Sequence, residues 1–287
     1  MTPKPDSSYL NLIEDARKIL FDATETPRID AEILLLHVLQ KPLAWLIANG
    51  NTTATAEQLK VYFRLVDERS RGYPIAYLIG YREFWTLKLK VTPDVLIPRP
   101  DTETLVEQAL SLIDKSQSSL ILDLGTGSGA IALAIAKECP QAEIVAVDSC
   151  NKALDLAKHN AQANHISNVT FTLSDWFQNI IPAKFDLILS NPPYIEKDDV
   201  HLSQGDLRFE PKSALVSGDS GLEDIKEIIL QAPKFLNKNA HIIIEHGFNQ
   251  AESVAEIFNN AGFDDVILSY DLNQLPRCTQ AKWAIND

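Results

Sequence analysis

The chain has 287 residues, of which 45% are hydrophobic and 23% are charged, and its formal net charge is −13. This length exceeds that of a usual single domain and predicts one large domain together with a smaller one. A protein that grips bare nucleic acid generally needs a basic face. The acidic balance therefore favours a protein partner over direct contact with nucleic acid.

Three features of the sequence bear on the cellular compartment. No segment approaches eighteen uninterrupted apolar residues, so we expect no membrane span. The first twenty residues lack the basic start and apolar stretch of a signal peptide. Cys139, Cys150 and Cys278 are widely spaced and odd in number, which argues against a disulfide framework or a CxxC metal site. Together these features predict a cytoplasmic protein.

The first part of the chain is predicted to be helical. Residues 10–20, 30–40 and 55–70 each place apolar residues three and four positions apart, and turn residues separate them. Aromatic residues, β-branched residues and prolines follow and predict a short β-hairpin. We expect a helical substrate-recognition domain over residues 1–75, a linker with a β-hairpin over 76–100, and the main domain over 101–287.

After a predicted helix over residues 101–113, predicted strands and helices alternate from Ser118 onward. The expected strands are residues 119–125, 143–148, 168–173, 185–190, 241–247, 264–270 and 278–285; the expected helices are residues 101–113, 129–139, 151–164, 222–236 and 252–262. Asp101 or Thr102 is the candidate N-cap of the first of these helices. The alternation predicts an α/β fold with an open, mostly parallel sheet covered by helices on both faces.

A glycine-rich turn follows the first of these strands. Gly125, Gly127 and Gly129 let the backbone adopt positive φ and approach a ligand closely, at the start of a helix whose N–H groups face the same ligand. Asp148 ends the next strand, where a carboxylate can accept bonds from ribose hydroxyls. The combination of strand, turn, helix and Asp148 predicts a nucleoside-containing cofactor.

The turn also bears on which cofactor binds. Its spacing is G-x-G-x-G, whereas dinucleotide-binding folds usually show G-x-G-x-x-G with a diphosphate over the helix. Asp123, just before the turn, fits poorly beside a diphosphate and suits a cofactor with a positively charged amino group. These features favour S-adenosyl-L-methionine over NAD.

A second loop, Ser190-Asn191-Pro192-Pro193-Tyr194, ends the strand over residues 185–190. The two prolines cannot continue a sheet and make the loop stiff. The side-chain oxygen of Asn191 and the carbonyl oxygen of Pro192 can accept hydrogen bonds from two N–H groups, and Tyr194 offers a flat surface for stacking. Because the lone pair of an amide nitrogen is delocalised, its methylation requires orientation and charge stabilisation, which such a loop can supply. The loop therefore predicts methyl transfer to a planar nitrogen.

Six motifs, in this order, resemble the PrmC/HemK family of release factor glutamine methyltransferases. They are IPRPDTETLVE (97–107), LDLGTGSGAIALA (122–134), AVD (146–148), SNPPYI (190–195), LRFEP (207–211) and EHG (245–247). The resemblance implies a Rossmann-like, seven-stranded class I methyltransferase domain after a small helical domain. It further implies methylation, by S-adenosyl-L-methionine, of the side-chain amide nitrogen (N5) of the glutamine in the Gly-Gly-Gln motif of peptide chain release factors. The product would be S-adenosyl-L-homocysteine, and we expect a monomer that contacts neither nucleic acid nor membrane.

The resemblance also implies roles for individual residues. Gly125, Thr126, Gly127, Ser128, Gly129, Asp148, Trp176 and Asn191 would bind the cofactor, with Asp148 on the ribose and Trp176 beside the adenine. Asn191, Pro192, Pro193 and Tyr194 would bind the substrate, and Asn191, Pro192 and Tyr194 would be catalytic. The SCNKAL segment after Asp148 lacks the Ser/Pro-containing helix start that is common in the family, which leaves the capping of that helix open.

Several alternatives stay open on the sequence. The chemistry of the loop also suits a ribosomal-protein glutamine methyltransferase or a DNA adenine-N6 methyltransferase, and a cofactor-binding scaffold without activity is a further class. His246 beside Glu245 has no second ligand at metal-binding spacing, so we expect a structural role and no metal site. Arg99 is a candidate for the cofactor region, the substrate backbone or a linker salt bridge. Arg208 and Glu210 are candidates to pair with each other.

Overall fold

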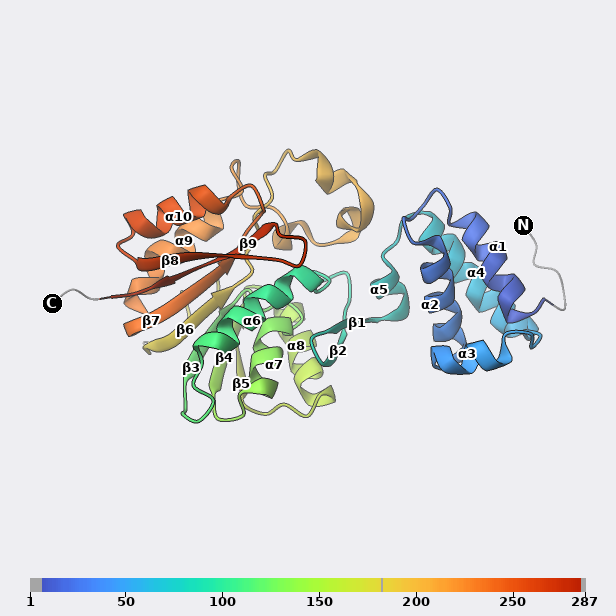
Figure 1. Ribbon diagram of the computed structural model, residues 1–287, viewed down its shortest axis with the longest axis horizontal. Helices are drawn as coiled ribbons and strands as arrows, with labels where there is room; N and C mark the ends of the chain where they lie inside the picture. Colours follow the sequence, from blue (N-terminus) through green and yellow to red (C-terminus); the bar gives the residue numbers. More distant parts are fainter. Residues whose placement is uncertain (1–6, 182, 285–287) are drawn as a thin grey trace. The chain divides into compact units, whose positions relative to one another are not determined.

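The computed structural model describes residues 7–181 and 183–284 (Figure 1). These residues form two compact units: one contains the described residues up to Gly80 together with His201–Phe209, and the other contains the rest. The predicted fold class, a helical domain followed by an α/β domain with a seven-stranded sheet, is confirmed. The division at Gly80 splits the predicted linker, and the sequence did not indicate that His201–Phe209 packs with the helical unit.

The helical unit contains the three predicted helices and two that were not predicted. Its helices are α1 (Tyr9–Ile19), α2 (Pro27–Leu39), α3 (Leu43–Asn49), α4 (Ala56–Ser70) and α5 (Ile75–Ile79). The side chain of Thr55 accepts a hydrogen bond from the backbone N–H of Gln58, whose own side chain accepts one from Thr55, so a capping box starts α4. The helices α3 and α5 have seven and five residues, too few to show a helical period.

The core of the helical unit packs around Tyr62, whose hydroxyl donates to the carbonyl oxygen of Ala31. In the same unit, the buried Arg69 guanidinium pairs with Asp30, the residue before Ala31, at 2.7 Å and with Asp206 at 3.2 Å. Asp206 belongs to a short 3-10 helix, Gly205–Phe209. Arg69 therefore fastens a segment from the second half of the sequence to the helical unit.

The second unit begins with the predicted hairpin, an antiparallel pair of β1 (Tyr81–Phe84) and β2 (Leu87–Lys90). The remaining strands are β3 (Leu120–Leu124), β4 (Glu143–Asp148), β5 (Val169–Leu173), β6 (Phe185–Ser190), β7 (Leu236–Glu245), β8 (Asp264–Tyr270) and β9 (Pro276–Lys282); the helices are α6 (Glu103–Leu112), α7 (Ala130–Glu138), α8 (Asn151–Ala163), α9 (Glu223–Gln231) and α10 (Ala251–Asn260). The predicted alternation of strands and helices is confirmed.

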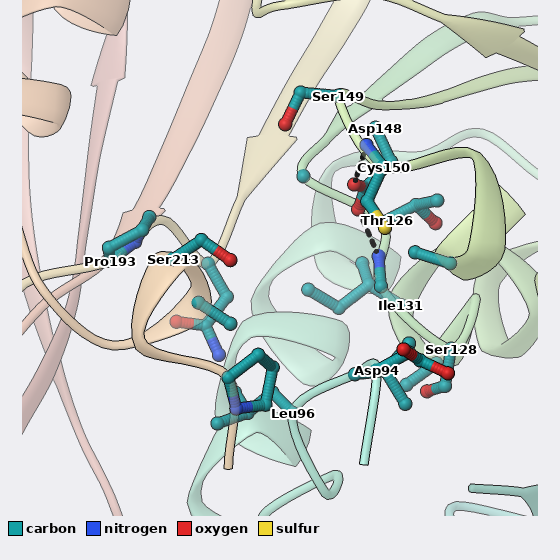
Figure 2. A pocket seen from close by; sticks show the side chains of 18 of the residues that line it. Asp94, Leu96, Thr126, Ser128, Ile131, Asp148, Ser149, Cys150, Pro193 and Ser213 are labelled. Atoms are coloured by element: carbon teal, nitrogen blue, oxygen red, sulfur yellow. Dashed lines mark hydrogen bonds between the residues drawn. The ribbon is translucent and has the colours of Figure 1, made fainter. Parts of the chain in front are cut away.

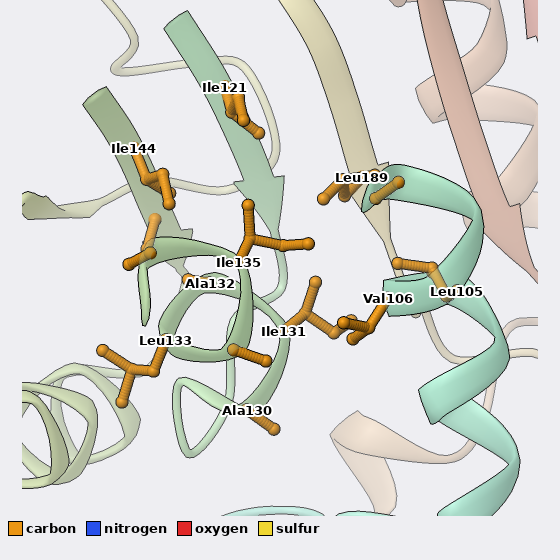
Figure 3. Packing of buried hydrophobic residues seen from close by; sticks show 14 of the residues in the cluster. Leu105, Val106, Ile121, Ala130, Ile131, Ala132, Leu133, Ile135, Ile144 and Leu189 are labelled. Atoms are coloured by element: carbon orange, nitrogen blue, oxygen red, sulfur yellow. The ribbon is translucent and has the colours of Figure 1, made fainter. Parts of the chain in front are cut away.

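The strands form one sheet in the order β5-β4-β3-β6-β7-β9-β8. The first five strands run parallel, and β9 runs antiparallel to both of its neighbours. Helices α6, α7 and α8 cover one face, where Val106, Ile131 and Leu189 meet (Figure 3). Helices α9 and α10 cover the other face through Ile228 and Phe258 (Figure 1). Both faces are buried, which explains the nearly continuous apolar strands in the sequence.

Within the described residues, no single helix is long and apolar enough to cross a membrane. Helices α2 and α3, which meet at a bend of 92°, are long and apolar enough only when they are counted as one segment, and this judgement rests on length and composition alone.

Candidate active site

The two functional loops predicted from the sequence leave neighbouring strands of the sheet. In the pairing of β3 with β6, Leu124 stands opposite Ser190. The glycine turn begins directly after Leu124, and the Asn191 loop begins directly after Ser190. The chain continues to one side of β3 through β4 and β5 and to the other side through β6 and β7. Ligands of open parallel sheets bind at such a reversal, beyond the carboxyl ends of the strands.

A cavity lies at this edge of the sheet (Figure 2). Its lining comes from the segment before α6, the glycine turn, the start of α8, the loop after β5, the Asn191 loop and the segment before α9. The lining residues that the argument uses are Asp94, Arg99, Thr102, Gly125, Thr126, Gly127, Ser128, Asp148, Cys150, Asp175, Trp176, Asn191, Pro193 and Asp224. All of them belong to the second unit.

The glycine turn presents its backbone to the cavity. Gly125 has φ of +74°, and a Cβ there would lie 3.3 Å from the ring of Trp176. Gly129 has φ of +86° at the N-terminus of α7, where a Cβ would meet the side chain of Leu133 at 3.0 Å. Both positions require glycine for conformation and for space. The side chains of Thr126 and Ser128 are buried, so the backbone forms much of this wall.

Asp148 organises the turn and the start of α8. One of its carboxylate oxygens accepts a hydrogen bond from the N–H of Gly127 at 2.9 Å, and the other accepts one from the N–H of Cys150 at 2.8 Å (Figure 2). Burial raises the pKa of Asp148, and these two bonds oppose the shift. Cys150, the N-cap of α8, makes no side-chain capping bond. The carboxylate of Asp148 therefore satisfies part of a helix start that the sequence left open.

Asp123 does not face the cavity, so it is not placed to contact the positively charged amino group of a cofactor directly. Its side chain is fully buried, does not line the cavity, and accepts a hydrogen bond from the Thr126 hydroxyl at 2.7 Å. Burial raises the pKa of Asp123 to about 7. The carboxyl group supports the glycine turn from behind.

Trp176 lines the cavity at the predicted position. Its indole N–H donates to Asp224 at 3.2 Å, and its backbone has φ of +42°, which is uncommon for a bulky residue. The Ser174 hydroxyl donates to the carbonyl oxygen of Trp176 at 2.8 Å. The surrounding bonds thus hold the ring against the glycine turn in a backbone conformation that costs energy.

Within the Asn191 loop, Asn191 and Pro193 line the cavity, whereas Pro192 and Tyr194 do not. The Asn191 side-chain N–H donates to the Thr102 hydroxyl at 3.3 Å. The hydroxyl of Tyr194 donates to Glu245 at 3.4 Å. Burial raises the pKa of Tyr194, and the Glu245 charge adds to that shift.

Other segments fix the backbone of this loop. The side-chain N–H of Gln250 donates to the carbonyl oxygen of Tyr194 at 3.0 Å and to that of Gly221 at 3.2 Å. A Cβ at Gly221 would lie only 2.5 Å from the Tyr194 carbonyl oxygen. Glycine is therefore required where the 217–222 loop passes the Asn191 loop.

The sequence alone did not determine the partners of Arg99, Arg208 and Glu210. Glu210 pairs with Arg99, and its other oxygen accepts a hydrogen bond from the backbone N–H of Ile97. Arg208 instead donates to the carbonyl oxygen of Gly205. Arg99 therefore has a structural partner and also lines the cavity. The sequence favoured Arg208 as the partner because it is two residues from Glu210, whereas Arg99 is 111 residues away and comes close only after folding.

Both ring nitrogens of His246 lie within hydrogen-bond distance of neighbouring groups of the fold. Its Nε2 lies 2.8 Å from the Thr279 hydroxyl and its Nδ1 lies 2.9 Å from the Gly247 carbonyl oxygen. The residue is fully buried, which lowers the pKa of the imidazole. Across residues 7–181 and 183–284, no cluster of three or more His, Cys, Asp and Glu residues could hold a metal ion.

Two family models match the chain. The PrmC N-terminal domain matches residues 11–80, and the methyltransferase small domain matches residues 102–218. Among solved structures, a methyltransferase from Pyrococcus furiosus has a TM-score of 0.53 at 15% identity over 69% of this chain and 90% of its own. The hMettl16 catalytic domain has a TM-score of 0.56 at 17% identity, over 78% and 82%. These structural matches establish the methyltransferase fold.

The curated relatives are far closer in sequence. The release factor glutamine methyltransferase of Aliivibrio fischeri is 44% identical over 94% of this chain and 95% of its own length. The enzyme of the same name from Escherichia coli strain K12 is 48% identical over 91% of this chain and 94% of its own. The chain therefore belongs to the release factor glutamine methyltransferase family.

Proposed function

We propose that the chain transfers a methyl group from S-adenosyl-L-methionine to the N5 amide nitrogen of the glutamine in the Gly-Gly-Gln motif of peptide chain release factors. Curated relatives that match nearly the whole chain are named for this activity. The observation that carries the proposal is that Gly125 and Asn191, from the ends of neighbouring strands, line one cavity. A cofactor on the glycine turn would thus face an amide held by the Asn191 loop.

The charges of the cavity suit S-adenosyl-L-methionine better than a diphosphate-bearing dinucleotide. Carboxylates of Asp94, Asp148, Asp175 and Asp224 line it, against the single guanidinium of Arg99. A diphosphate would meet net repulsion there, whereas a cofactor with an amino group and a sulfonium is attracted. Asp148 would bind the ribose, and Trp176 would cover the adenine at the glycine turn. When bound, S-adenosyl-L-methionine supplies an electrophilic methyl group.

The chain's own residues would orient the amide nitrogen. We propose that Asn191, which lines the cavity, and Pro192, which lies outside the cavity lining, hold the glutamine carboxamide through their side-chain and carbonyl oxygens, each of which accepts a hydrogen bond from one N–H of the carboxamide. Positive charge develops on the nitrogen as the new N–C bond forms, and both oxygens stabilise it before one proton leaves to solvent. Tyr194 does not line the cavity, so its contribution is indirect: its hydroxyl donates to Glu245 and its carbonyl oxygen accepts from Gln250, which holds the loop in a fixed position.

The direct test uses S-adenosyl-L-methionine labelled in its methyl group and a purified release factor. We expect one methyl group per release factor, on the glutamine of the Gly-Gly-Gln motif, located by mass spectrometry. A release factor with that glutamine replaced should take up no label. Incorporation that is unchanged after the replacement would falsify the assignment of the substrate residue.

The same assay separates the alternatives. Ribosomal proteins and a DNA duplex containing adenine are offered in parallel, and both should stay unlabelled under conditions that label the release factor. Labelling of a ribosomal protein or of DNA alone would replace the proposed substrate. We also propose that the chain acts in the cytoplasm as a monomer; a molar mass of twice 31.9 kDa in light scattering would contradict the monomer.

A further inference from the structure

Thr102 is the last residue of the 3-10 helix Pro100–Thr102 and immediately precedes α6, and its own backbone is helical. A threonine that caps a helix instead has an extended backbone and accepts a bond from a backbone N–H of the first turn. Thr102 makes no such bond. Its side chain is buried, lines the cavity and accepts a hydrogen bond from the Asn191 side-chain N–H at 3.3 Å. The hydroxyl is thus directed to the Asn191 loop and not to a backbone N–H of α6.

The direction of this bond fixes the orientation of the Asn191 carboxamide. The group carries an oxygen and an NH2 on opposite sides, so an NH2 that faces Thr102 turns the oxygen away from it. A hydroxyl can donate as well as accept. Taken alone, therefore, Thr102 would also tolerate the flipped carboxamide.

In its ionised form, Glu245 removes that ambiguity. The Thr102 hydroxyl interacts with the Glu245 carboxyl and favours the charged form of that group, which opposes the rise of its pKa. An ionised carboxylate only accepts, so the Thr102 proton then points to Glu245 and the hydroxyl lone pairs are left for Asn191. Glu245 is itself buried and is also held by the Tyr194 hydroxyl. Above the raised pKa of Glu245, about 7, the chain of bonds from Glu245 through Thr102 to Asn191 therefore has one consistent direction.

We infer that Thr102, held by Glu245, is a positioning residue that turns the Asn191 side-chain oxygen toward the substrate amide. This inference rests on the proposed role of Asn191. In the flipped carboxamide the NH2 of Asn191 would face the NH2 of the substrate, so two donors would oppose each other. Loss of the Thr102 hydroxyl therefore lowers turnover without removing any group that touches the cofactor's charged atoms.

The test compares Thr102→Val, which keeps the shape and removes the hydroxyl, with Thr102→Ser, which keeps the hydroxyl. With release factor and labelled S-adenosyl-L-methionine, we expect kcat of Thr102→Val to fall about tenfold to a hundredfold, the range of one oriented hydrogen bond. Thr102→Ser should restore kcat to within about threefold of the wild type. The dissociation constant for S-adenosyl-L-methionine, measured by calorimetry, should change less than about threefold in both.

The matched control is Thr104→Val, at a buried threonine of the same helix that does not line the cavity. This variant should leave kcat unchanged. It shows whether the loss of any buried hydroxyl from this region is enough to lower kcat. Should Thr102→Val fail to fold, as judged by circular dichroism, Thr102→Ala takes its place in the same comparison. A wild-type kcat in the folded variant would overturn the inference.

A double-mutant cycle separates this inference from the function on which it rests. In the Asn191→Ala background, single-turnover rates should drop less than about twofold further when Thr102→Val is added. An equal loss in both backgrounds would show that Thr102 acts independently of Asn191 and would overturn the positioning role. Full activity of Asn191→Ala alone would instead overturn the proposed function of the loop.

Discussion

The Ser190 hydroxyl donates a hydrogen bond of 2.8 Å to the backbone carbonyl oxygen of Leu124. These are the last residues of β6 and β3, and both side chains are fully buried. The bond spans the two strands at the point where their pairing ends, immediately before Gly125 and Asn191. The bond therefore helps to fix the distance between the glycine turn and the Asn191 loop. In the proposed function, this distance determines how far the methyl donor lies from the substrate amide.

Replacing Ser190 by alanine should affect both stability and turnover. The substitution leaves the buried carbonyl oxygen of Leu124 without this donor, at a cost of about 1–2 kcal/mol in the free energy of unfolding. We expect kcat to fall several-fold, since the two loops lose their common anchor. Ser111→Ala, at an exposed serine of α6 that bonds to the Gln108 carbonyl oxygen, is the control and should change neither quantity. A destabilised Ser190→Ala with wild-type kcat would show that the anchor serves the fold alone.

Asp148 is predicted to govern cofactor affinity. In Asp148→Asn, an NH2 group must replace one of the two oxygens that accept from Gly127 and Cys150. The glycine turn therefore shifts, and the bond to ribose weakens. We expect the dissociation constant for S-adenosyl-L-methionine to rise about tenfold to a hundredfold, equivalent to about 1.4–2.8 kcal/mol. The KM for the release factor should stay within about twofold of the wild type.

The control for this prediction is Asp155→Asn on α8. The Asp155 side chain is 77% exposed and pairs with the nearby Lys158, so its loss should leave cofactor affinity unchanged. Equal affinity of Asp148→Asn and the wild type, measured by calorimetry, would remove Asp148 from the cofactor site.

The fold could be predicted because hydrophobic pattern alone determines most of its elements. The apolar runs of β3 and β6 and the three- and four-residue spacing of α1, α2 and α4 depend on burial of one face or of both. The predictions failed where tertiary contacts decide the structure. The short helix α3 has no period to read, and His201–Phe209 joins the helical unit through Arg69, which is 137 residues before Asp206.

In the candidate site too, the predictions succeeded where local sequence decides the structure and failed where tertiary contacts decide it. Gly125, Asp148 and Trp176 line the cavity as expected, since backbone geometry after a strand places them there. Thr102 was predicted as a candidate N-cap, and residue type and position both favoured capping. Its actual partner, Asn191, is 89 residues away, so only the folded structure reveals the competing bond. Glu245 was noted in the EHG motif but had no predicted partner, because Tyr194, which donates to it, is 51 residues away.

The buried carboxyl of Glu245 should make stability depend on pH. Burial raises the pKa of Glu245 from the ordinary 4.5 to about 7, and the bonds from Thr102 and Tyr194 and the charge of Arg277 oppose the shift, while the charge of Asp101 adds to it. Between these pH values the folded protein keeps a proton that the unfolded chain has released. The free energy of unfolding therefore falls as pH rises through this window, by up to about 3 kcal/mol from this group.

Glu245→Gln tests that contribution, because glutamine resembles the protonated acid. The variant should match the wild type near pH 5 and become the more stable of the two as pH rises toward 8. Urea unfolding of both proteins at several pH values measures the difference. A difference that is independent of pH, or that grows on acidification, would contradict the raised pKa.

The last prediction concerns the ion pairs of Arg69 in the helical unit. Its guanidinium is 10% exposed, Asp30 is 5% exposed and Asp206 is 35% exposed. Asp30→Asn leaves a buried cation without its closest counterion, which costs about 3–5 kcal/mol. Asp206→Asn removes a partner that water can replace, at a cost of about 0–1 kcal/mol.

Hydrogen exchange followed by mass spectrometry separates these effects along the chain. Asp30→Asn should speed exchange throughout α1, α2 and α4, because the buried pair supports the core around Tyr62. Asp206→Asn should speed exchange only in His201–Phe209, because Asp206 fastens that segment and no helix depends on it. Equal effects of both variants on α2 would show that the segment is an integral part of the helical core, which would contradict the ranking of the two carboxylates by burial.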